Sequence, residues 1–186
     1  MNTQLQPAQA PAAHAENFFR NAGGIAIKMP ALQRPVHEEL PAKFPWIYGF
    51  EYDTSPTDTS FLALWTVLRE DELNPIQGDE YKRRVAATRA TFFGYQHADL
   101  LVEGQDEFPE FVKIFEEECE DNVLYAHPYV DFLGLIVLDK DRRRFCPRIS
   151  VDDKKRLFRG WTWLDRGFRP SGRIAVAGSL IPFVVG

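Results

Sequence analysis

The sequence has few cysteines and no long apolar run. Cys119 and Cys146 are the only two cysteines among 186 residues, too few for the disulfide framework of a small secreted domain. The longest nearly uninterrupted apolar runs, at 132–138 and 174–185, are shorter than the roughly 20 residues of a membrane-spanning helix. We therefore expect two free thiols and no membrane span.

The N-terminal part lacks the basic segment and the continuous apolar core of a secretory signal, so we expect a cytoplasmic protein. Residues 1–15 are rich in Gln, Ala and Pro, which is typical of a flexible tail. Four prolines between residues 30 and 45 then predict an extended arm. The expected organisation is a tail over 1–15, an arm over 16–56 that wraps the domain or a neighbouring subunit, and a globular domain over 57–186.

No motif specific for catalysis or for metal binding is present. The segment 172–179 contains two glycines but lacks the Gly-Lys-Ser/Thr of a nucleotide-binding loop. His127, Asp131 and the two cysteines are groups that zinc or a thiol enzyme uses, but their spacing matches no standard site. Four acids between residues 99 and 107 could serve a hydrolase or a magnesium site, although acid runs usually form solvated faces. We therefore expect no enzymatic activity, no metal and no cofactor.

Hydrophobic periodicity indicates helices and strands without a strict βαβ alternation. It predicts helices over 58–73, 79–92, 107–120 and 150–163, and strands over 132–138, 143–149, 173–178 and 180–185. A buried strand is the alternative for 61–68, because seven of its eight residues are apolar. The predicted fold class is α+β: a single domain in which a mixed or antiparallel sheet packs against several helices, preceded by the arm.

Local signals around residues 139–153 refine this prediction. Residues 139–142 are typical of a turn, which would join the strands on either side into a hairpin. Pro147 lacks an N–H group and predicts that the second of these strands lies at a sheet edge. Ser150 and Asp153 match a capping box and predict the start of the helix that follows.

Positive charge is concentrated in one part of an acidic chain. Residues 140–173, the basic stretch, contain 12 of the 22 Lys and Arg against four Asp, a charge of +8, whereas the whole chain carries −5. Nine of these twelve cations are arginines, and five aromatic residues are interleaved with them. A row of cations neutralises phosphates, and exposed aromatic rings stack on bases. The predicted binding residues are Arg142, Arg143, Arg144, Arg148, Lys154, Lys155, Arg159, Trp163, Arg166, Arg169 and Arg173, which could line one continuous groove.

Groups other than nucleic acid could also neutralise the positive charge of the basic stretch. The acidic band at 99–121 holds ten acids against Lys113 alone, and internal pairing with it is the more frequent explanation of such asymmetry. An acidic protein surface is another candidate, and the arm offers a contact for a homo- or hetero-oligomer. The sequence carries no RRM, KH, zinc-finger or helix-turn-helix signature, and its pI near 5.4 is low for a nucleic-acid-binding domain.

Three functions of different classes follow from these observations. The first is a non-enzymatic binding protein that contacts single-stranded or structured nucleic acid through the basic stretch. The second is a protein–protein interaction or assembly subunit, such as a particle component or an inhibitor, that uses its opposite charge fields. The last is an enzyme that uses His127 with nearby carboxylates or Cys146, which rests only on the presence of suitable side chains.

Overall fold

A computed structural model describes residues 20–21, 27–35, 37–69, 72, 74–120 and 128–178, with the backbone alone for 20, 21 and 116–120. The predicted tail, the predicted strand over 180–185, His127 and the side chain of Cys119 lie outside this description. The helices are α1 (Glu39–Lys43), α2 (Gly78–Thr88), α3 (Tyr95–Glu103) and α4 (Pro109–Glu120), with short 3-10 helices η2 (Gln105–Glu107) and η3 (Leu164–Arg166). The strands are β1 (Arg20–Asn21), β2 (Ile27–Met29), β3 (Gly49–Asp53), β4 (Ser60–Thr66), β5 (Thr91–Phe92), β6 (Tyr129–Asp131), β7 (Leu135–Leu138), β8 (Arg144–Val151), β9 (Leu157–Trp163) and β10 (Gly172–Gly178).

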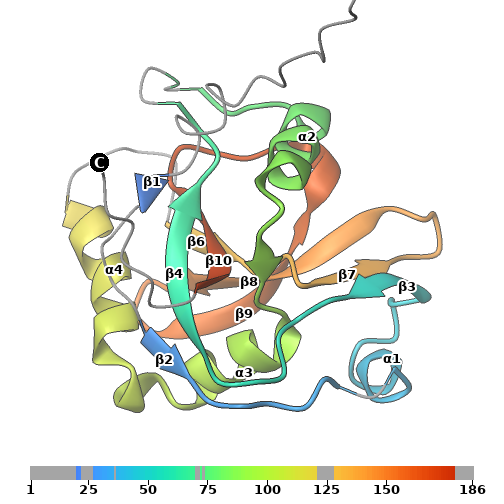
Figure 1. Cartoon of the computed structure of the whole chain (residues 1–186), viewed down its shortest axis with the longest axis horizontal. Coiled ribbons are helices and arrows are strands. Elements are labelled where there is room, and N and C mark those ends of the chain that lie inside the picture. Colours follow the sequence, from blue (N-terminus) through green and yellow to red (C-terminus); the bar gives the residue numbers. More distant parts are fainter. Residues whose placement is uncertain are drawn as a thin grey trace, which may run out of the picture.

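The described strands form one mixed sheet (Figure 1). Its path runs β1-β4-β10-β6-β8-β7-β3, while β2 pairs with β4, β5 with β10 and β9 with β8. The β10–β6 pair is parallel, and the other described pairs are antiparallel. A mixed sheet with packed helices is an α+β fold, as predicted. Within the predicted arm, β2 and β3 pair with β4 and β7 and so belong to this sheet.

Helices cover both faces of the sheet, with α2 above it and α3 below it in Figure 1. Alternation along β10 explains this arrangement, because successive side chains of a strand point to opposite faces. Ile174 and Val176 pack in one cluster with Tyr81 of α2. Ala175 packs in another cluster with residues of α3 and α4. No helix in the described part of the chain is long and apolar enough to cross a bilayer.

Several predicted elements are confirmed. The helix predicted over 79–92 appears as α2, and the one over 107–120 as α4. In α4 the apolar stripe that includes Phe111 and Phe115 is buried, and Pro109 occupies the first helical position, where its missing N–H group breaks no bond. The hairpin appears as β7 and β8, and β10 matches the strand predicted over 173–178.

Two predicted helices are wrong, because their segments form β4 and β9. The helical spacing around Leu64 is overridden in β4, since β10 pairs along one side of this strand and β1 and β2 along the other. In the second segment no capping box forms. Asp152 instead accepts bonds from the N–H groups of Lys154 and Arg156, both at 2.9 Å, and Lys155 has a φ of 59°. Residues 152–156 are therefore a tight turn between β8 and β9.

Pro147 does not mark an edge strand. β8 pairs with β9 along one side and with β7 and then β6 along the other. The N–H group of Phe132 donates to the Pro147 carbonyl at 2.8 Å, so the Pro147 backbone faces the junction between β7 and β6. Pro147 therefore lies where the partner strand of β8 changes from β7 to β6. At this position the missing N–H group of proline removes no hydrogen bond from the ladder.

Arg84 of α2 is a buried cation. Only 5% of its side chain is exposed, and its guanidinium donates to the Val67 carbonyl at 2.7 Å. It also forms ion pairs with Glu72 at 2.5 Å and Glu80 at 2.6 Å. Hydrogen bonds from Arg84 lower the pKa of Glu72 to about 2, and bonds from Arg83 and Arg84 do the same for Glu80. These contacts join α2 to the end of β4.

Candidate nucleic-acid interface

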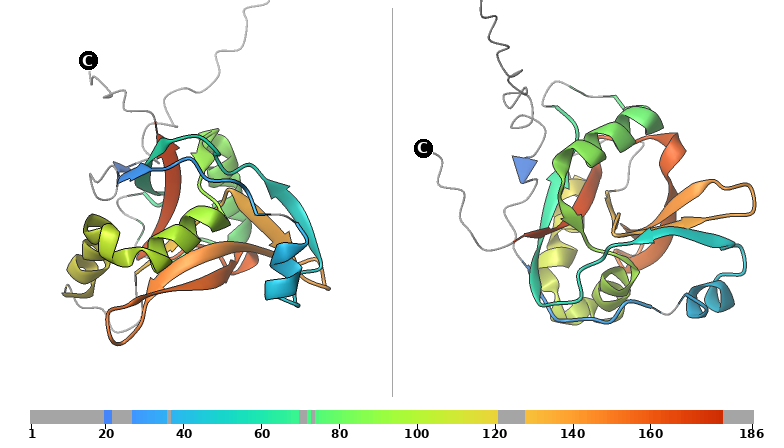
Figure 2. Two further views of the ribbon diagram at one scale, coloured as in Figure 1. Left: turned by 90° about the horizontal axis from the view of Figure 1, so that it is seen from below. Right: turned by 45° about the vertical axis from the view of Figure 1, so that its right-hand side comes forward.

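The fold spreads the cations of the basic stretch over two turns, two strands and a loop. Lys140, Arg142 and Arg143 lie in the turn between β7 and β8, and Lys154, Lys155 and Arg156 lie in the turn between β8 and β9. Arg144 and Arg148 belong to β8 and Arg159 belongs to β9, while Arg166, Arg169 and Arg173 follow from the end of η3 through the next loop into β10. The two turns lie at opposite ends of β8, whose eight residues span about 25 Å (Figure 2). Lys154 and Lys155 therefore lie apart from Arg142, and the predicted residues do not form one short cluster.

Four of the predicted arginines form ion pairs with acids in the described part of the chain. These pairs are Arg143 with Asp139 at 2.7 Å and Asp141 at 3.2 Å, Arg144 with Glu51 at 2.7 Å, Arg148 with Asp131 at 3.3 Å, and Arg159 with Asp99 and with Glu103 at 3.7 Å. Among them, only Arg159 contacts the part of the acidic band whose side chains the structure describes. The acids that neutralise these four arginines therefore lie on several different elements of the fold.

The remaining predicted cations lie on the surface or contact the backbone. Arg142, Lys154, Lys155 and Arg169 are exposed and form no ion pair with any described residue, and the same is true of Lys140. The guanidinium of Arg173 donates to the carbonyls of Pro170 at 3.0 Å and Gly172 at 2.9 Å. Arg142 is exposed and has a φ of 60° at the tip of the β7–β8 turn.

An open groove lies beside the exposed cations of the β7–β8 turn. We call it the aromatic groove; its cavity measures about 690 Å³. It is lined by Pro45, Trp46, Tyr48, Asp139, Lys140, Arg143, Phe145 and Trp161. Trp46, Phe145 and Trp161 are half-buried, whereas Tyr48 is 70% exposed. The groove thus combines large rings with two cations at its rim.

Strand register places these rings together. Phe145 lies opposite Trp163, and Pro147 lies opposite Trp161, so the three aromatic side chains share one face of the β8–β9 ribbon. The segment before β3 brings Trp46 onto that face, where its ring centroid lies 5.1 Å from those of both Phe145 and Trp161. The Tyr48 N–H group donates to the Leu138 carbonyl at 2.8 Å and holds this segment against the end of β7.

Trp163 extends the aromatic surface beyond the groove. Its ring is contacted by the guanidinium groups of Arg143 at 5.6 Å and Arg166 at 5.2 Å, distances typical of cation–π contacts. Its indole N–H donates to Asp165 at 3.0 Å. Of the eleven predicted residues, the fold therefore brings Arg142, Arg143, Trp163 and Arg166 to the same end of the ribbon.

Sequence reasoning missed most of the groove. Phe145 and Trp161 are among the aromatic residues of the basic stretch, but Trp46 and Tyr48 come from a segment about 100 residues earlier. Three aromatic residues between 44 and 48, flanked by prolines, are the one local signal that marks this segment. Nothing in the sequence indicates that it packs on β8 and β9.

A buried polar cluster lies on the opposite face of the ribbon. The Asp131 carboxylate accepts hydrogen bonds from Arg148 and Tyr81, both at 3.3 Å, and from the hydroxyl of Thr162. Burial raises the pKa of Asp131, and the charge of Arg148 opposes this shift. Burial likewise raises the pKa of Tyr81 well above its usual value. Thr162 lies between Trp161 and Trp163 in β9, so this cluster holds the strand that carries the groove.

The groups considered for catalysis do not assemble in the described residues. Burial raises the pKa of the Cys146 thiol well above its usual value, so this group stays protonated near neutral pH and is a poor nucleophile. In the described ranges, no three His, Cys, Asp or Glu side chains come close enough to hold a metal ion.

Comparison of the chain with protein-family models, with curated proteins and with solved structures finds no match.

Proposed function

We propose that this protein binds single-stranded nucleic acid, without catalysing a reaction, through the aromatic groove and the cations around it. The observation that carries the proposal is the convergence of Trp46, Phe145 and Trp161 in one open groove whose rim holds Lys140 and Arg143. Surfaces that bind single strands combine two components, aromatic rings that stack on the bases and cations that contact the phosphates. This choice narrows the wider expectation of single-stranded or structured nucleic acid.

Single strands fit better than duplexes, because a ring inside a groove reaches only an unpaired base. Bases of a duplex are stacked on each other and present edges rather than faces. Tyr48 offers the most exposed ring, and the half-buried rings of Trp46 and Trp161 can take a base edge-on or against their free faces. Each base stacked on an aromatic side chain contributes about 1–3 kcal/mol.

The cations of this end supply contacts for the phosphates. Lys140 and Arg142 are exposed and have no acid partner among the described residues, and Arg166 is held by the Trp163 ring. Asp139 is the one acid in the groove lining. Burial opposes its ionisation, but hydrogen bonds from Arg143 and Asp141 outweigh burial and lower the pKa of Asp139. Its charge is therefore already matched by donors and repels phosphates little.

Fluorescence anisotropy with labelled 15-nucleotide DNA and RNA tests the proposal. At low salt we expect a saturable rise with single strands, and weaker competition by an unlabelled duplex than by an unlabelled single strand. Tryptophan fluorescence should change in the same titration, because two of the groove rings are tryptophans. If none of these DNA or RNA probes forms a complex at low salt, the proposal is wrong.

A second candidate, assembly by addition of a β-strand, is favoured by the outer edge of β9. The N–H group of Asp152 donates to the Arg156 carbonyl at 3.0 Å, and alternation along the ladder then turns the backbone of Arg159, Trp161 and Trp163 away from β8. No described strand pairs with this side of β9. Such an edge can accept a strand of another chain. Light scattering over a hundredfold range of protein concentration tests it; a monomer throughout would contradict self-assembly.

A further inference from the structure

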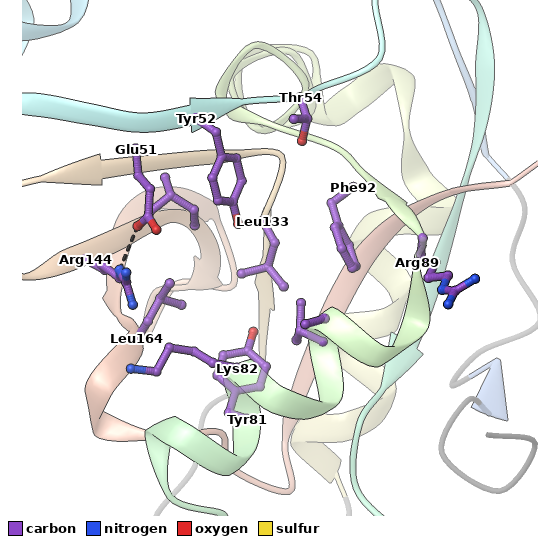
Figure 3. A pocket seen from close by; sticks show the side chains of 14 residues that line it. Glu51, Tyr52, Thr54, Tyr81, Lys82, Arg89, Phe92, Leu133, Arg144 and Leu164 are labelled. Atoms are coloured by element: carbon purple, nitrogen blue, oxygen red, sulfur yellow. Dashed lines mark ion pairs between the residues drawn. The ribbon is translucent and has the colours of Figure 1, made fainter. Parts of the chain in front are cut away.

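A second cavity lies between α2 and β3, away from the aromatic groove. Its volume is about 390 Å³, within the range of small-molecule sites. The two cavities share no lining residue. Side chains from β3, α2, β7, β8 and η3 surround it, and Leu133 projects into it from the loop between β6 and β7 (Figure 3).

The floor of this cavity is apolar. Leu133, Ile136 and Leu164 are buried in the hydrophobic cluster under α2, and Val85 and Phe92 lie half-buried beside them. The rings of Tyr52 and Tyr81 point toward this floor from opposite sides (Figure 3). An apolar ligand body of matching size would remove this surface from water, which favours binding by about 25 cal/mol per Å².

Cations outnumber acids around that floor. The charged residues in the lining are Lys82, Arg89 and Arg144 against Glu51 alone. Arg144 pairs with Glu51 at 2.7 Å, and Lys82 pairs with Asp165 at 2.7 Å. Arg89 is exposed at the other end of the cavity and forms no ion pair with any described residue. The cavity therefore has one cation whose charge is not yet matched.

Hydrogen-bond donors add to this preference. Burial raises the pKa of Tyr52 to about 12, so its hydroxyl stays protonated and can donate. The Thr54 hydroxyl also lines the cavity. Arg89 itself has a φ of 52° at the end of α2, a conformation that favours glycine. Arg89 thus lies at the mouth of the cavity, at a backbone position that would accept a smaller residue more easily, and its side chain extends away from the apolar floor (Figure 3).

We propose that this cavity is a binding site for a small organic anion, with an apolar body on the Leu133 floor and an acidic group paired with Arg89. Charge complementarity selects the anion, since a cationic ligand of the same shape meets the unmatched charge of Arg89. The site does not depend on nucleic-acid binding. Its lining faces away from Trp46 and Trp161.

Titration of the full chain with 8-anilinonaphthalene-1-sulfonate, an apolar anion that fluoresces in apolar sites, tests the proposal. We expect saturable fluorescence with the folded protein. Octanoate should displace the probe at concentrations at least tenfold lower than octylammonium, which has the same chain length and the opposite charge. Absence of saturable fluorescence, or equal displacement by the two octyl compounds, overturns the proposal.

Two pairs of variants locate the site. Ala86 and Ala87 are neighbouring exposed residues of α2, and only Ala86 lines the cavity. Ala86→Trp should weaken probe binding at least tenfold, whereas Ala87→Trp should leave it unchanged. Arg89→Gln should weaken octanoate displacement about fivefold, whereas Arg83→Gln on the same helix should not. Equal effects within either pair would show that the anion binds elsewhere and overturn the assignment.

Discussion

Arg148 and Asp131 lie opposite each other on β8 and β6, and the Arg148 Nε donates to the Asp131 carboxylate at 3.3 Å. Asp131 is fully buried, and the guanidinium of Arg148 also stacks on Tyr129 at 3.8 Å. This arginine, predicted as a nucleic-acid ligand, instead compensates a charge in the middle of the sheet. Loss of one partner in a buried pair leaves the other charge without compensation.

Arg148→Met should therefore destabilise the fold by about 3 kcal/mol. Urea unfolding at pH 7 measures this free energy. The double variant Asp131→Asn/Arg148→Met should lose less than the sum of the single variants, because the two residues interact. Arg156→Met is the matched control: its pair with Asp152 at 3.0 Å is exposed, so we expect a change below about 0.5 kcal/mol. Equal losses for the two arginine variants would contradict this role.

His97 should make stability depend on pH. The side chain is completely buried, neither ring nitrogen has a hydrogen-bond partner among the residues that the structure describes, and burial lowers the pKa of His97 to about 4. The unfolded chain therefore takes up a proton near pH 6.5, whereas the folded chain does so only near pH 4. Stability from neutral His97 should be present above pH 6.5 and fall by about 3 kcal/mol as pH drops toward 4.

Chemical unfolding of the wild type and of His97→Leu between pH 7.5 and 4.5 measures this contribution. The difference in unfolding free energy between the two proteins should shift in favour of His97→Leu as pH falls. Other titrating groups are common to both proteins and cancel in this difference. A difference that stays constant from pH 7 to pH 5 would show that His97 does not titrate as its surroundings imply.

Trp46→Leu should weaken single-strand binding about tenfold, since the loss of one stacking ring costs about 1–3 kcal/mol. Leucine keeps an apolar side chain against Phe145 and so limits the effect on folding. Phe158→Leu is the matched control, because Phe158 is 45% exposed but lies toward the other end of β9 and outside the groove. Anisotropy titrations of both variants should separate them. A larger loss for Phe158→Leu would place the binding surface elsewhere.

The salt dependence of binding should distinguish the two turns of the ribbon. Replacing Lys140 and Arg142 by Gln should reduce the slope of log K against log salt by about 1.4, at about 0.7 for each lost phosphate contact. The same double replacement of Lys154 and Lys155, about 25 Å away along β8, should leave the slope unchanged. Equal reductions would mean that the strand follows the whole ribbon, as the continuous groove predicted from the sequence requires.

The sequence by itself determined the elements whose signals are local. The apolar stripe of α4 and the alternation of β10 repeat at the spacing of one secondary structure. Asp139 accepts hydrogen bonds from the N–H groups of Asp141 and Arg143, both at 2.9 Å, so the β7–β8 turn is stabilised by its own residues. The charge asymmetry of the basic stretch is likewise a property of composition. This asymmetry is the same whichever group each cation contacts in the folded chain.

Tertiary structure decided everything that depends on contacts between distant residues. β4 carries a helical spacing but forms a strand, because β10 and β2 offer backbone partners on both sides. In the sequence, nothing distinguishes Arg84 and Arg148 from surface cations. Only folding places them beside the acids with which they pair. The aromatic groove has the same origin, since Trp46 meets Phe145 and Trp161 only after β3, β7, β8 and β9 have paired. Local propensity is weak beside the free energy of burying rings and pairing charges across the sheet, so the site is a product of the fold.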